Sequence, residues 1–128
     1  LRLILNQYIT KQIASALACT HKQGFFHRDL KPENVLISEN LAVKIIDFES
    51  LNKLGVCHHL LNIFRRDGIS SLIAFRFPTY SAPVDIFALG CLVAEMYLKK
   101  PLFQGNSEMD QISKICSVIG SPTMQNWP

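Results

Sequence analysis

The 128-residue chain is 48% hydrophobic and 18% charged, a composition typical of a globular domain with one modest core and not of a disordered chain. Thirteen Lys and Arg against ten Asp and Glu give a net charge of +3. These basic residues are scattered and form no nucleic-acid-binding stripe, so we expect no nucleic-acid partner. No apolar run reaches the roughly 18–20 residues that a membrane helix needs, so we expect no membrane partner either.

The four cysteines are widely spaced, without a Cys-x-x-Cys pair, and the chain has no signal peptide. This pattern favours reduced thiols in an intracellular compartment. The chain opens with leucine rather than methionine, which suggests a piece of a longer protein.

The first predicted element is a helix over residues 3–22. Its apolar residues recur at helical spacing, and Gly24 stands just past the expected end, where glycine commonly caps a helix. A polar loop follows, and then two short strands over residues 34–37 and 42–46, joined by a turn at residues 38–40. The catalytic candidates described below therefore lie on loops between rigid elements.

Two further helices are predicted in the second half of the chain. Residues 84–98 are almost continuously apolar, which indicates a helix buried on most faces. Ser107 is the expected N-cap of a helix that continues to about residue 118, with Glu108 and Asp110 near its positive end.

Residues 27–34 read His-Arg-Asp-Leu-Lys-Pro-Glu-Asn, and Asp47-Phe48 follows the second predicted strand. This order resembles the catalytic loop and the magnesium-binding segment of protein kinases. The alternative, a chance tripeptide followed by a turn residue, leaves the other ordered positions unexplained. The resemblance implies an α+β fold like the large, C-terminal lobe of a protein kinase, mostly helical, with short strands carrying the catalytic loop.

The resemblance also implies a role for each residue of the loop. Asp29 would accept or orient the proton of the substrate hydroxyl, and Lys31 would bring a positive charge to the transferred phosphate, in the pattern of serine/threonine kinases. Arg28 would pair with an anion on the activation segment. Asn34 and Asp47 would hold Mg²⁺, and the nucleotide-contacting residues would be Glu33 and Leu36. The implied cofactors are ATP and Mg²⁺, and the implied partner is a protein substrate.

Several segments sharpen the resemblance. Residues 24–26, 101–103, 107–115 and 119–122, together with Trp127-Pro128, are similar to the MAK, ICK and MOK (RCK) serine/threonine kinases of the CMGC group. Residues 83–91 are similar to the start of this family's buried helix, which implies that Asp85 holds the backbone of the catalytic loop. The resemblance suggests a cytoplasmic, nuclear or ciliary setting and leaves the oligomeric state unknown.

The resemblance covers residues 1–48 and 79–128 and fails between them. Glu49 stands where the family has glycine, and no Ala-Pro-Glu follows, yet the spacing from Asp47 to Asp85 is close to the family's own. A shifted reading frame explains both facts. If a nucleotide is lost after the Phe48 codon, residues 60–69 can be read in the shifted frame as Thr-Glu-Tyr-Ile-Ser-Thr-Arg-Trp-Tyr, the phosphorylation motif of this group and the stretch after it. We therefore predict that residues 49–78 are an out-of-frame activation segment.

For three histidine-containing features of the sequence we expect neither metal binding nor proton transfer. Residues 57–59, Cys-His-His, are adjacent and lack a distant partner, so we expect no zinc site there. His21 is expected to be structural or solvated, and His27 to brace the loop rather than transfer protons.

The sequence contains no glycine-rich loop and no strand lysine for the phosphates, so residues 1–128 are predicted to be an incomplete kinase domain without the small lobe and the final helices. We expect this chain alone to be inactive and to expose apolar surface. Two functions remain open: a fragment of an ATP-dependent serine/threonine kinase, or a pseudokinase or protein-binding module. The intact residues of the catalytic loop and Asp47 favour the first; in the second, the helix over residues 107–118 would serve as a docking surface and Glu49 would spoil the hinge that glycine provides.

Overall fold

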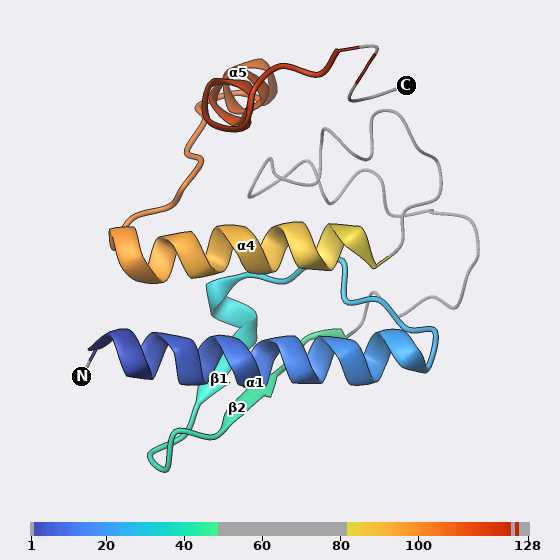
Figure 1. Ribbon diagram of the computed structural model, residues 1–128, viewed down its shortest axis with the longest axis vertical. Coiled ribbons are helices and arrows are strands. Elements are labelled where there is room, and N and C mark those ends of the chain that lie inside the picture. The colour runs from blue at the N-terminus through green and yellow to red at the C-terminus, as the bar shows by residue number, and fades with distance from the viewer. Residues whose placement is uncertain (1, 49–81, 124, 126–128) are drawn as a thin grey trace.

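The computed structural model describes residues 2–48, 82–123 and 125. In these ranges the chain forms a long helix, a short 3-10 helix, a two-stranded hairpin and two more helices (Figure 1). In chain order they are α1 (Arg2–Lys22), η1 (Pro32–Asn34), β1 (Val35–Ile37), β2 (Val43–Ile45), α4 (Pro83–Leu98) and α5 (Glu108–Ile119). The segment predicted to be out of frame, with its Cys-His-His run, lies outside the described residues.

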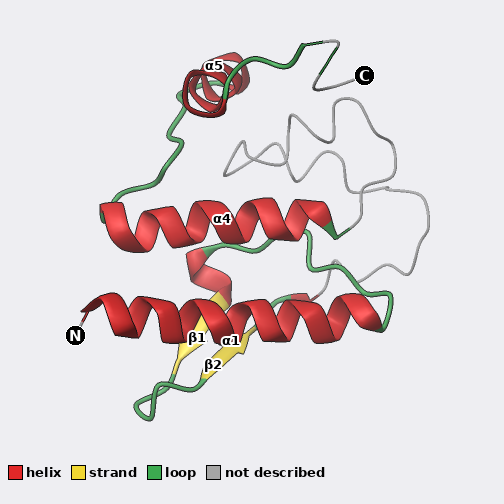
Figure 2. Ribbon diagram, in the orientation of Figure 1, coloured by secondary structure: helices red, strands yellow, loops and turns green. Residues whose placement is uncertain are grey.

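Helix α4 forms the middle of the arrangement. Helices α1 and α4 lie side by side and run in opposite directions, α5 lies on the other side of α4, and the hairpin packs against α1 through β2 (Figures 1 and 2). The expectation of a mostly helical fold with two short strands is confirmed. The strands pair antiparallel, with Val35 opposite Ile45 and Ile37 opposite Val43. Each strand is slightly shorter than predicted, and η1 was not predicted.

Helix α1 carries the largest apolar cluster on one face. Ile9, Ile13 and Leu17 recur every four residues and are buried, because side chains at this spacing stack on the same side of a helix. They pack against Leu30 of the loop and against Leu89 and Leu92 of α4. This cluster joins the helix, the loop and α4.

The predicted glycine cap ends α1. Gly24 has a left-handed φ of 82°, a conformation that glycine adopts without steric cost. Its N–H donates to the His21 carbonyl at 2.9 Å, and the Phe25 N–H donates to the Thr20 carbonyl at 3.0 Å. These two bonds form a Schellman motif, which turns the chain sharply into the loop.

Helix α4 separates two apolar clusters. One side contributes Leu89 and Leu92 to the cluster on α1, and the other packs Cys91 against Phe103 and Ile115. The predicted burial on most faces is only partly right, because Ile86, Tyr97 and Leu98 are about half exposed. Packing partners occupy two sides of the helix, and these three residues face solvent.

Polar contacts at the start of helix α5 hold it to the loop before it, in addition to the packing of Ile115. Ser107 is the N-cap, as predicted, and its Oγ accepts a hydrogen bond from the Asp110 N–H at 3.2 Å. The Asp110 carboxylate accepts from the Asn106 N–H and pairs with Lys114, and these contacts lower its pKa. The side chain of Gln111 is buried and bonds to the backbone of Gly105 and Phe103. The loop before α5 is thereby held against the helix.

Candidate active site

The loop between α1 and η1 is anchored to α4 by one buried carboxylate. Asp85 is 1% exposed, and its Oδ2 and Oδ1 accept hydrogen bonds from the backbone N–H groups of His27 (2.8 Å) and Arg28 (2.7 Å). The prediction that Asp85 holds the backbone of the loop is confirmed. A third donor that the sequence did not predict, Nε2 of His21, lies 2.7 Å from Oδ2.

The loop backbone is strained where it meets this anchor. Arg28 has a φ of 67°, a left-handed conformation that costs a non-glycine residue about 1–3 kcal/mol unless its surroundings impose it. Here the hydrogen bond to Asp85 fixes the Arg28 peptide. Strain of this kind concentrates at functional sites, and Asp29 is the next residue. The anion expected to pair with Arg28 would lie on residues 49–81, outside the described part of the chain.

Two of the predicted site residues, Lys31 and Asn34, both contact a third, Asp29. The Nζ of Lys31 lies 2.6 Å from Oδ2 of Asp29. The Nδ2 of Asn34 donates to the Asp29 carbonyl at 2.8 Å and to its Oδ2 at 3.3 Å. Asp29 is nonetheless 44% exposed and Lys31 is 19% exposed. The Asp29 carboxylate is held by Lys31 and Asn34 and is still open to solvent, so its geometry allows it to receive a proton from an incoming hydroxyl.

His27 joins this loop to the end of β2. Its side chain is fully buried, its Nε2 bonds to the Ile46 carbonyl at 3.0 Å, and its Nδ1 accepts from the Asp29 N–H at 3.3 Å. The ring also packs edge-on against Phe48 at 4.9 Å. Both ring nitrogens are therefore committed to the backbone, and the expectation that His27 braces the loop is confirmed.

Asp47, the predicted metal ligand, follows β2 directly after a residue that is bonded to Asn34. The N–H of Ile46, the residue before Asp47, donates to the Asn34 carbonyl at 2.9 Å. Asp47 itself is exposed and has a left-handed φ of 66°. Two of the four non-glycine residues with a left-handed φ in the described chain, Arg28 and Asp47, thus belong to the predicted site.

The donor set around these two residues fits Mg²⁺. Asp47 offers an exposed carboxylate, and the bonds from Nδ2 of Asn34 to Asp29 leave the amide oxygen of Asn34 for another partner. Mg²⁺ binds through one or two protein oxygens and completes its shell with water and phosphate oxygens. Among the described residues, no cluster of three or more His, Cys, Asp or Glu side chains could hold a metal ion.

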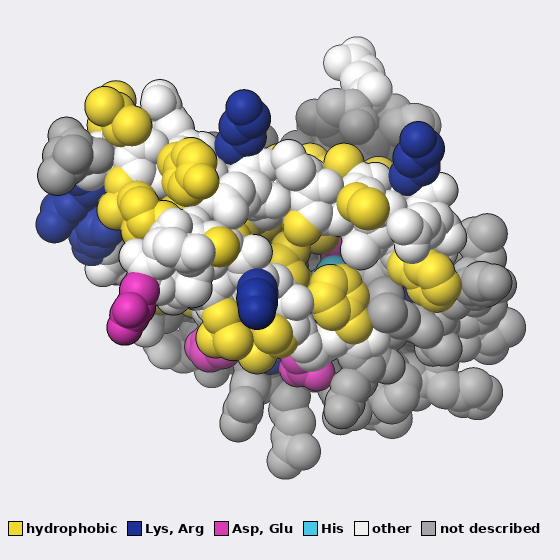
Figure 3. Space-filling model, turned by 90° about the horizontal axis from the view of Figure 1, so that it is seen from below, with side chains coloured by type: hydrophobic (Ala, Val, Ile, Leu, Met, Phe, Trp, Pro, Cys, Tyr) yellow, Lys and Arg dark blue, Asp and Glu magenta, His cyan; other side chains and the backbone are white. Residues whose placement is uncertain are grey.

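The two residues predicted to contact the nucleotide are accessible. Glu33 lies in η1, and Leu36 lies in β1 with half of its side chain exposed. In the view from the hairpin side, exposed hydrophobic side chains lie among both basic and acidic ones (Figure 3).

A cavity of about 130 Å³ opens between the loop and α4, and the sequence did not predict it. Residues 30–33, one side of α4 and residues 101–103 line it. The thiol of Cys91 belongs to this lining, and burial raises its pKa to about 11. That pKa keeps Cys91 protonated at neutral pH, so it is no candidate nucleophile.

Other supporting contacts also escaped the sequence analysis. Gln12 of α1 donates from Nε2 to the Leu41 carbonyl at 2.9 Å and accepts at Oε1 from the Val43 N–H at 3.1 Å. Asn6 donates to the Met96 carbonyl at 3.4 Å. In the sequence, a polar residue on the apolar side of a predicted helix indicates a hydrogen bond. It does not indicate which residue completes that bond.

The chain is similar to known protein kinases over most of its length. The chain is 44% identical over 124 residues to the mouse serine/threonine-protein kinase ICK and 42% identical over 121 residues to the human serine/threonine-protein kinase MAK. Each comparison covers 94% of this chain and 19% of the relative. Cyclin-dependent kinase 4 of Xenopus laevis is 40% identical over 126 residues, 94% of this chain and 38% of that protein.

These relatives confirm the resemblance to the MAK and ICK kinases, although the chain spans only about a fifth of their length. In the described residues no helix combines the length and the apolar character needed to cross a membrane. The sequence model of the protein kinase domain matches residues 5–128. With the Asp29, Lys31 and Asn34 contacts and these relatives, that match establishes that the chain belongs to the protein kinase family.

Proposed function

We propose that this chain carries the substrate-side catalytic machinery of an ATP-dependent protein serine/threonine kinase. The observation that supports this most directly is the contact between the Asp29 carboxylate, the Lys31 ammonium and the Asn34 amide. Phosphoryl transfer needs an oriented acceptor hydroxyl and a concentration of positive charge at the phosphates. This cluster, beside Asp47, can supply both.

In the proposed reaction, the substrate Ser or Thr oxygen forms a bond to the γ-phosphorus while the bond to the β,γ-bridging oxygen breaks. The hydroxyl proton passes to Oδ of Asp29, and ADP leaves. Lys31 stabilises the charge on the transferred group. Lys31 also lies close enough to Asp29 to hold the carboxylate in place before substrate binds.

Asn34 and Asp47 are the proposed ligands of Mg²⁺, which neutralises the phosphate oxygens when it is bound. Glu33 and Leu36 are the proposed nucleotide contacts, and their exposure supports this. Arg28 is proposed to bind an anion on the activation segment, since a guanidinium suits bidentate pairing.

The described residues are proposed to belong to the large lobe of the kinase domain, with a protein substrate and a cytoplasmic, nuclear or ciliary setting. Residues 1–128 on their own should not transfer phosphate. The family holds the ATP phosphates with a Gly-x-Gly-x-x-Gly loop and a strand lysine, and the printed sequence contains no such glycine pattern.

The test is a graft in which residues 2–48 replace the aligned residues of human MAK, which supplies the remaining parts of a kinase domain. We expect the grafted kinase to phosphorylate a basic protein substrate. Asp29→Asn and Asp47→Asn should each lower kcat by at least about 100-fold, because they remove the proton acceptor and a metal ligand. Glu39→Gln, in the exposed hairpin turn, is the matched control and should leave kcat unchanged.

The alternative, a pseudokinase or protein-binding module, predicts a different outcome. A folded graft that binds Mg²⁺ and ATP but transfers no phosphate would contradict the proposed kinase chemistry. Phosphate transfer by residues 1–128 alone, above the level of their Asp29→Asn variant, would contradict the proposal that this chain is inactive by itself. Sequencing genomic DNA and transcript across residues 46–85 decides whether residues 49–78 are out of frame.

A further inference from the structure

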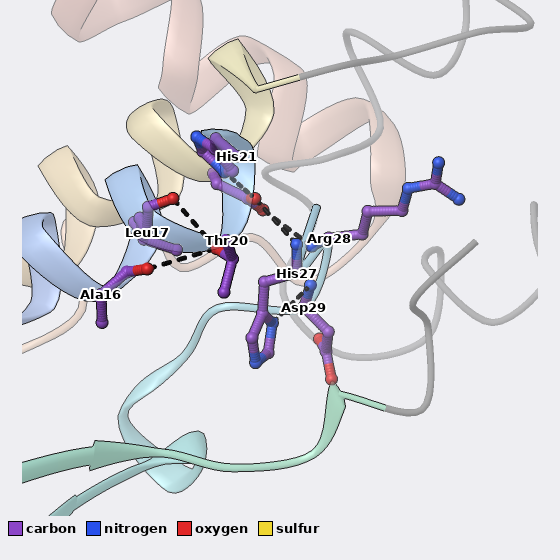
Figure 4. A network of polar contacts seen from close by, with 8 residues as sticks. Ala16, Leu17, Thr20, His21, His27, Arg28 and Asp29 are labelled. Carbon is purple, nitrogen blue, oxygen red and sulfur yellow. Dashed lines mark hydrogen bonds and ion pairs between the residues drawn. The ribbon is translucent and has the colours of Figure 1, made fainter. Parts of the chain in front are cut away.

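The two halves of the candidate site are attached to the helices at different places. The loop that carries Asp29 is bonded to Asp85 of α4 through the backbone N–H of Arg28 (Figure 4). The hairpin carries the proposed nucleotide contact Leu36 and leads to the proposed metal ligand Asp47. In the described part of the chain, the hydrogen bonds of Asp85 go to the loop and to α1 and not to the hairpin, so other contacts fix the hairpin.

The hairpin is short, and its apolar contacts define its position only weakly. It contains three pairs of residues, and an isolated two-stranded hairpin is marginally stable at best in water. Val35, Val43 and Ile45 pack against the apolar cluster on α1. Apolar contacts are not directional, so they allow the strands to shift along the helix. A directional contact between α1 and the hairpin prevents such a shift.

Gln12, a half-buried residue in the middle of α1, makes a directional contact of this kind. Its Nε2 donates to the Leu41 carbonyl at 2.9 Å, and its Oε1 accepts from the Val43 N–H at 3.1 Å. In a parallel ladder, one residue bonds in the same way to the two residues that flank its neighbour. The side-chain amide of Gln12 therefore binds the start of β2 as one residue of an adjacent strand would.

The opposite edge of the same segment is held by Ser38. The Ala42 carbonyl accepts from the Ser38 N–H at 3.0 Å, and the Ala42 N–H donates to the Ser38 Oγ at 3.1 Å. Leu41, on the edge that Gln12 binds, has a left-handed φ of 62°. A non-glycine residue keeps this conformation only where its surroundings impose it. Gln12 binds the carbonyl of this strained residue and thereby stabilises the turn.

The residues bound by Gln12 lie close to the nucleotide and metal contacts. Lys44, which follows Val43, is the partner of Leu36 in the ladder. Asp47 lies four residues after Val43, about 13 Å of extended chain. The end of β2 is bonded separately to the loop. A strand held at both ends has one position, whereas a strand held at one end can pivot.

We propose that Gln12 is a positioning residue for the nucleotide side of the site, acting through the hairpin. It holds Leu36 and Asp47 where MgATP is proposed to bind, and it touches neither substrate. The substrate side, with Asp29, keeps its own anchor at Asp85. The proposal rests on the proposed function of this site in ATP-dependent phosphate transfer.

Three variants separate the two hydrogen bonds from the packing of the side chain. Gln12→Met keeps the length of the side chain and removes both bonds. Gln12→Asn keeps the amide but is one methylene shorter, so it does not reach both partners. Gln7→Met, the same substitution at an exposed position of α1, is the matched control.

In the 128-residue chain, hydrogen exchange of the Val43 amide is measured at residue resolution against the slowest amide of α4. We expect Gln12→Met and Gln12→Asn to raise this relative exchange rate about tenfold, because the Val43 N–H loses its acceptor. Gln7→Met should leave the rate unchanged.

In the grafted kinase, kcat and the KM values for MgATP and for the protein substrate are measured. We expect Gln12→Met and Gln12→Asn to raise the KM for MgATP about fivefold, because the hairpin is displaced, and to leave the KM for the protein substrate within about twofold. A role limited to stability predicts less folded enzyme, which lowers kcat and leaves both KM values unchanged. That result overturns the proposal, as does unchanged exchange of Val43 or an equal effect of Gln7→Met.

Two further outcomes are distinguishable. If Gln12→Met does not fold, Gln12→Asn decides in the same measurements. A grafted kinase that transfers no phosphate with Gln12 present contradicts the proposed function separately. The Kd for MgATP then replaces the KM: an increase in the Gln12 variants supports the positioning role, and no increase, or no binding of MgATP at all, overturns it.

Discussion

At the scale of single residues, the candidate site contains backbone conformations that are unusual. Arg28 and Asp47 both have left-handed φ values and flank the cluster of Asp29, Lys31 and Asn34. Sequence motifs identified all five residues, because their types and order are distinctive. The conformations could not be predicted from local pattern; that of Arg28 is fixed by Asp85, 57 positions away in sequence.

The two cysteines Cys19 and Cys91 should differ sharply in reactivity. Cys19 is exposed, whereas Cys91 is buried and its pKa is raised to about 11. At pH 8 we expect iodoacetamide to modify Cys91 at least about 100-fold more slowly than Cys19, because thiolate is the reactive form. Mass spectrometry after timed alkylation measures this, and comparable rates would contradict the burial of Cys91.

The same shift predicts a pH dependence of stability. The fold favours the protonated thiol of Cys91, so this contribution is fully present below the ordinary pKa of 9.0 and is lost as pH rises towards about 11. Denaturant unfolding of wild type and Cys91→Ala at pH 8 and pH 10.5 tests this, and the variant should lose less stability on going to the higher pH.

At the scale of elements, local pattern was sufficient for the helices and the strands but not for how they are joined. The four-residue spacing in α1, the cap at Ser107 and the glycine after Lys22 all gave correct predictions. Contacts such as that of Gln12 with the hairpin lie 29 and 31 positions apart, and no periodicity encodes them. The cavity was missed for the same reason, because it forms only where three segments meet.

Gly105 should be essential for the attachment of α5. A Cβ at this position would lie 2.6 Å from the backbone Cα and N of Gln111, which cannot move without displacing the helix. We expect Gly105→Ala to lower the free energy of unfolding by about 1–3 kcal/mol, measured with urea. Gly90→Ala is the control: a Cβ there meets nothing within 4 Å, and alanine in a helix should stabilise by up to about 1 kcal/mol.

At the scale of the whole molecule, the described elements bury two clusters and leave much apolar surface in contact with solvent. Hydrophobic residues on α1, α4 and the hairpin are about half exposed, among them Leu3, Ile37 and Ile86. Exposed apolar surface of this extent favours association. Composition alone indicated a chain with a core to bury, but which helix faces stay open depends on the packing.

Ile86→Ser should reduce this association without weakening the fold. Ile86 is 54% exposed and Leu89 is 9% exposed on the same helix. We expect Ile86→Ser to lower self-association in sedimentation experiments and to change the unfolding free energy by less than about 1 kcal/mol. Leu89→Ser should instead destabilise by more than about 2 kcal/mol, because it places a hydroxyl in the core. Equal effects of the two variants would contradict this arrangement.

The hydrogen bonds that join the elements also fix the positions of the helices relative to one another. Apolar contacts between helices do not fix one position strongly, since a helix that slides by one turn, about 5.4 Å, presents a similar surface. Asn6 on Met96, Gln12 on the hairpin and Asp85 on the loop each oppose such a slide. Loss of one of these side chains should therefore free a helix, the hairpin or the loop to shift from its described position, in addition to any loss of stability from the buried groups left unpaired.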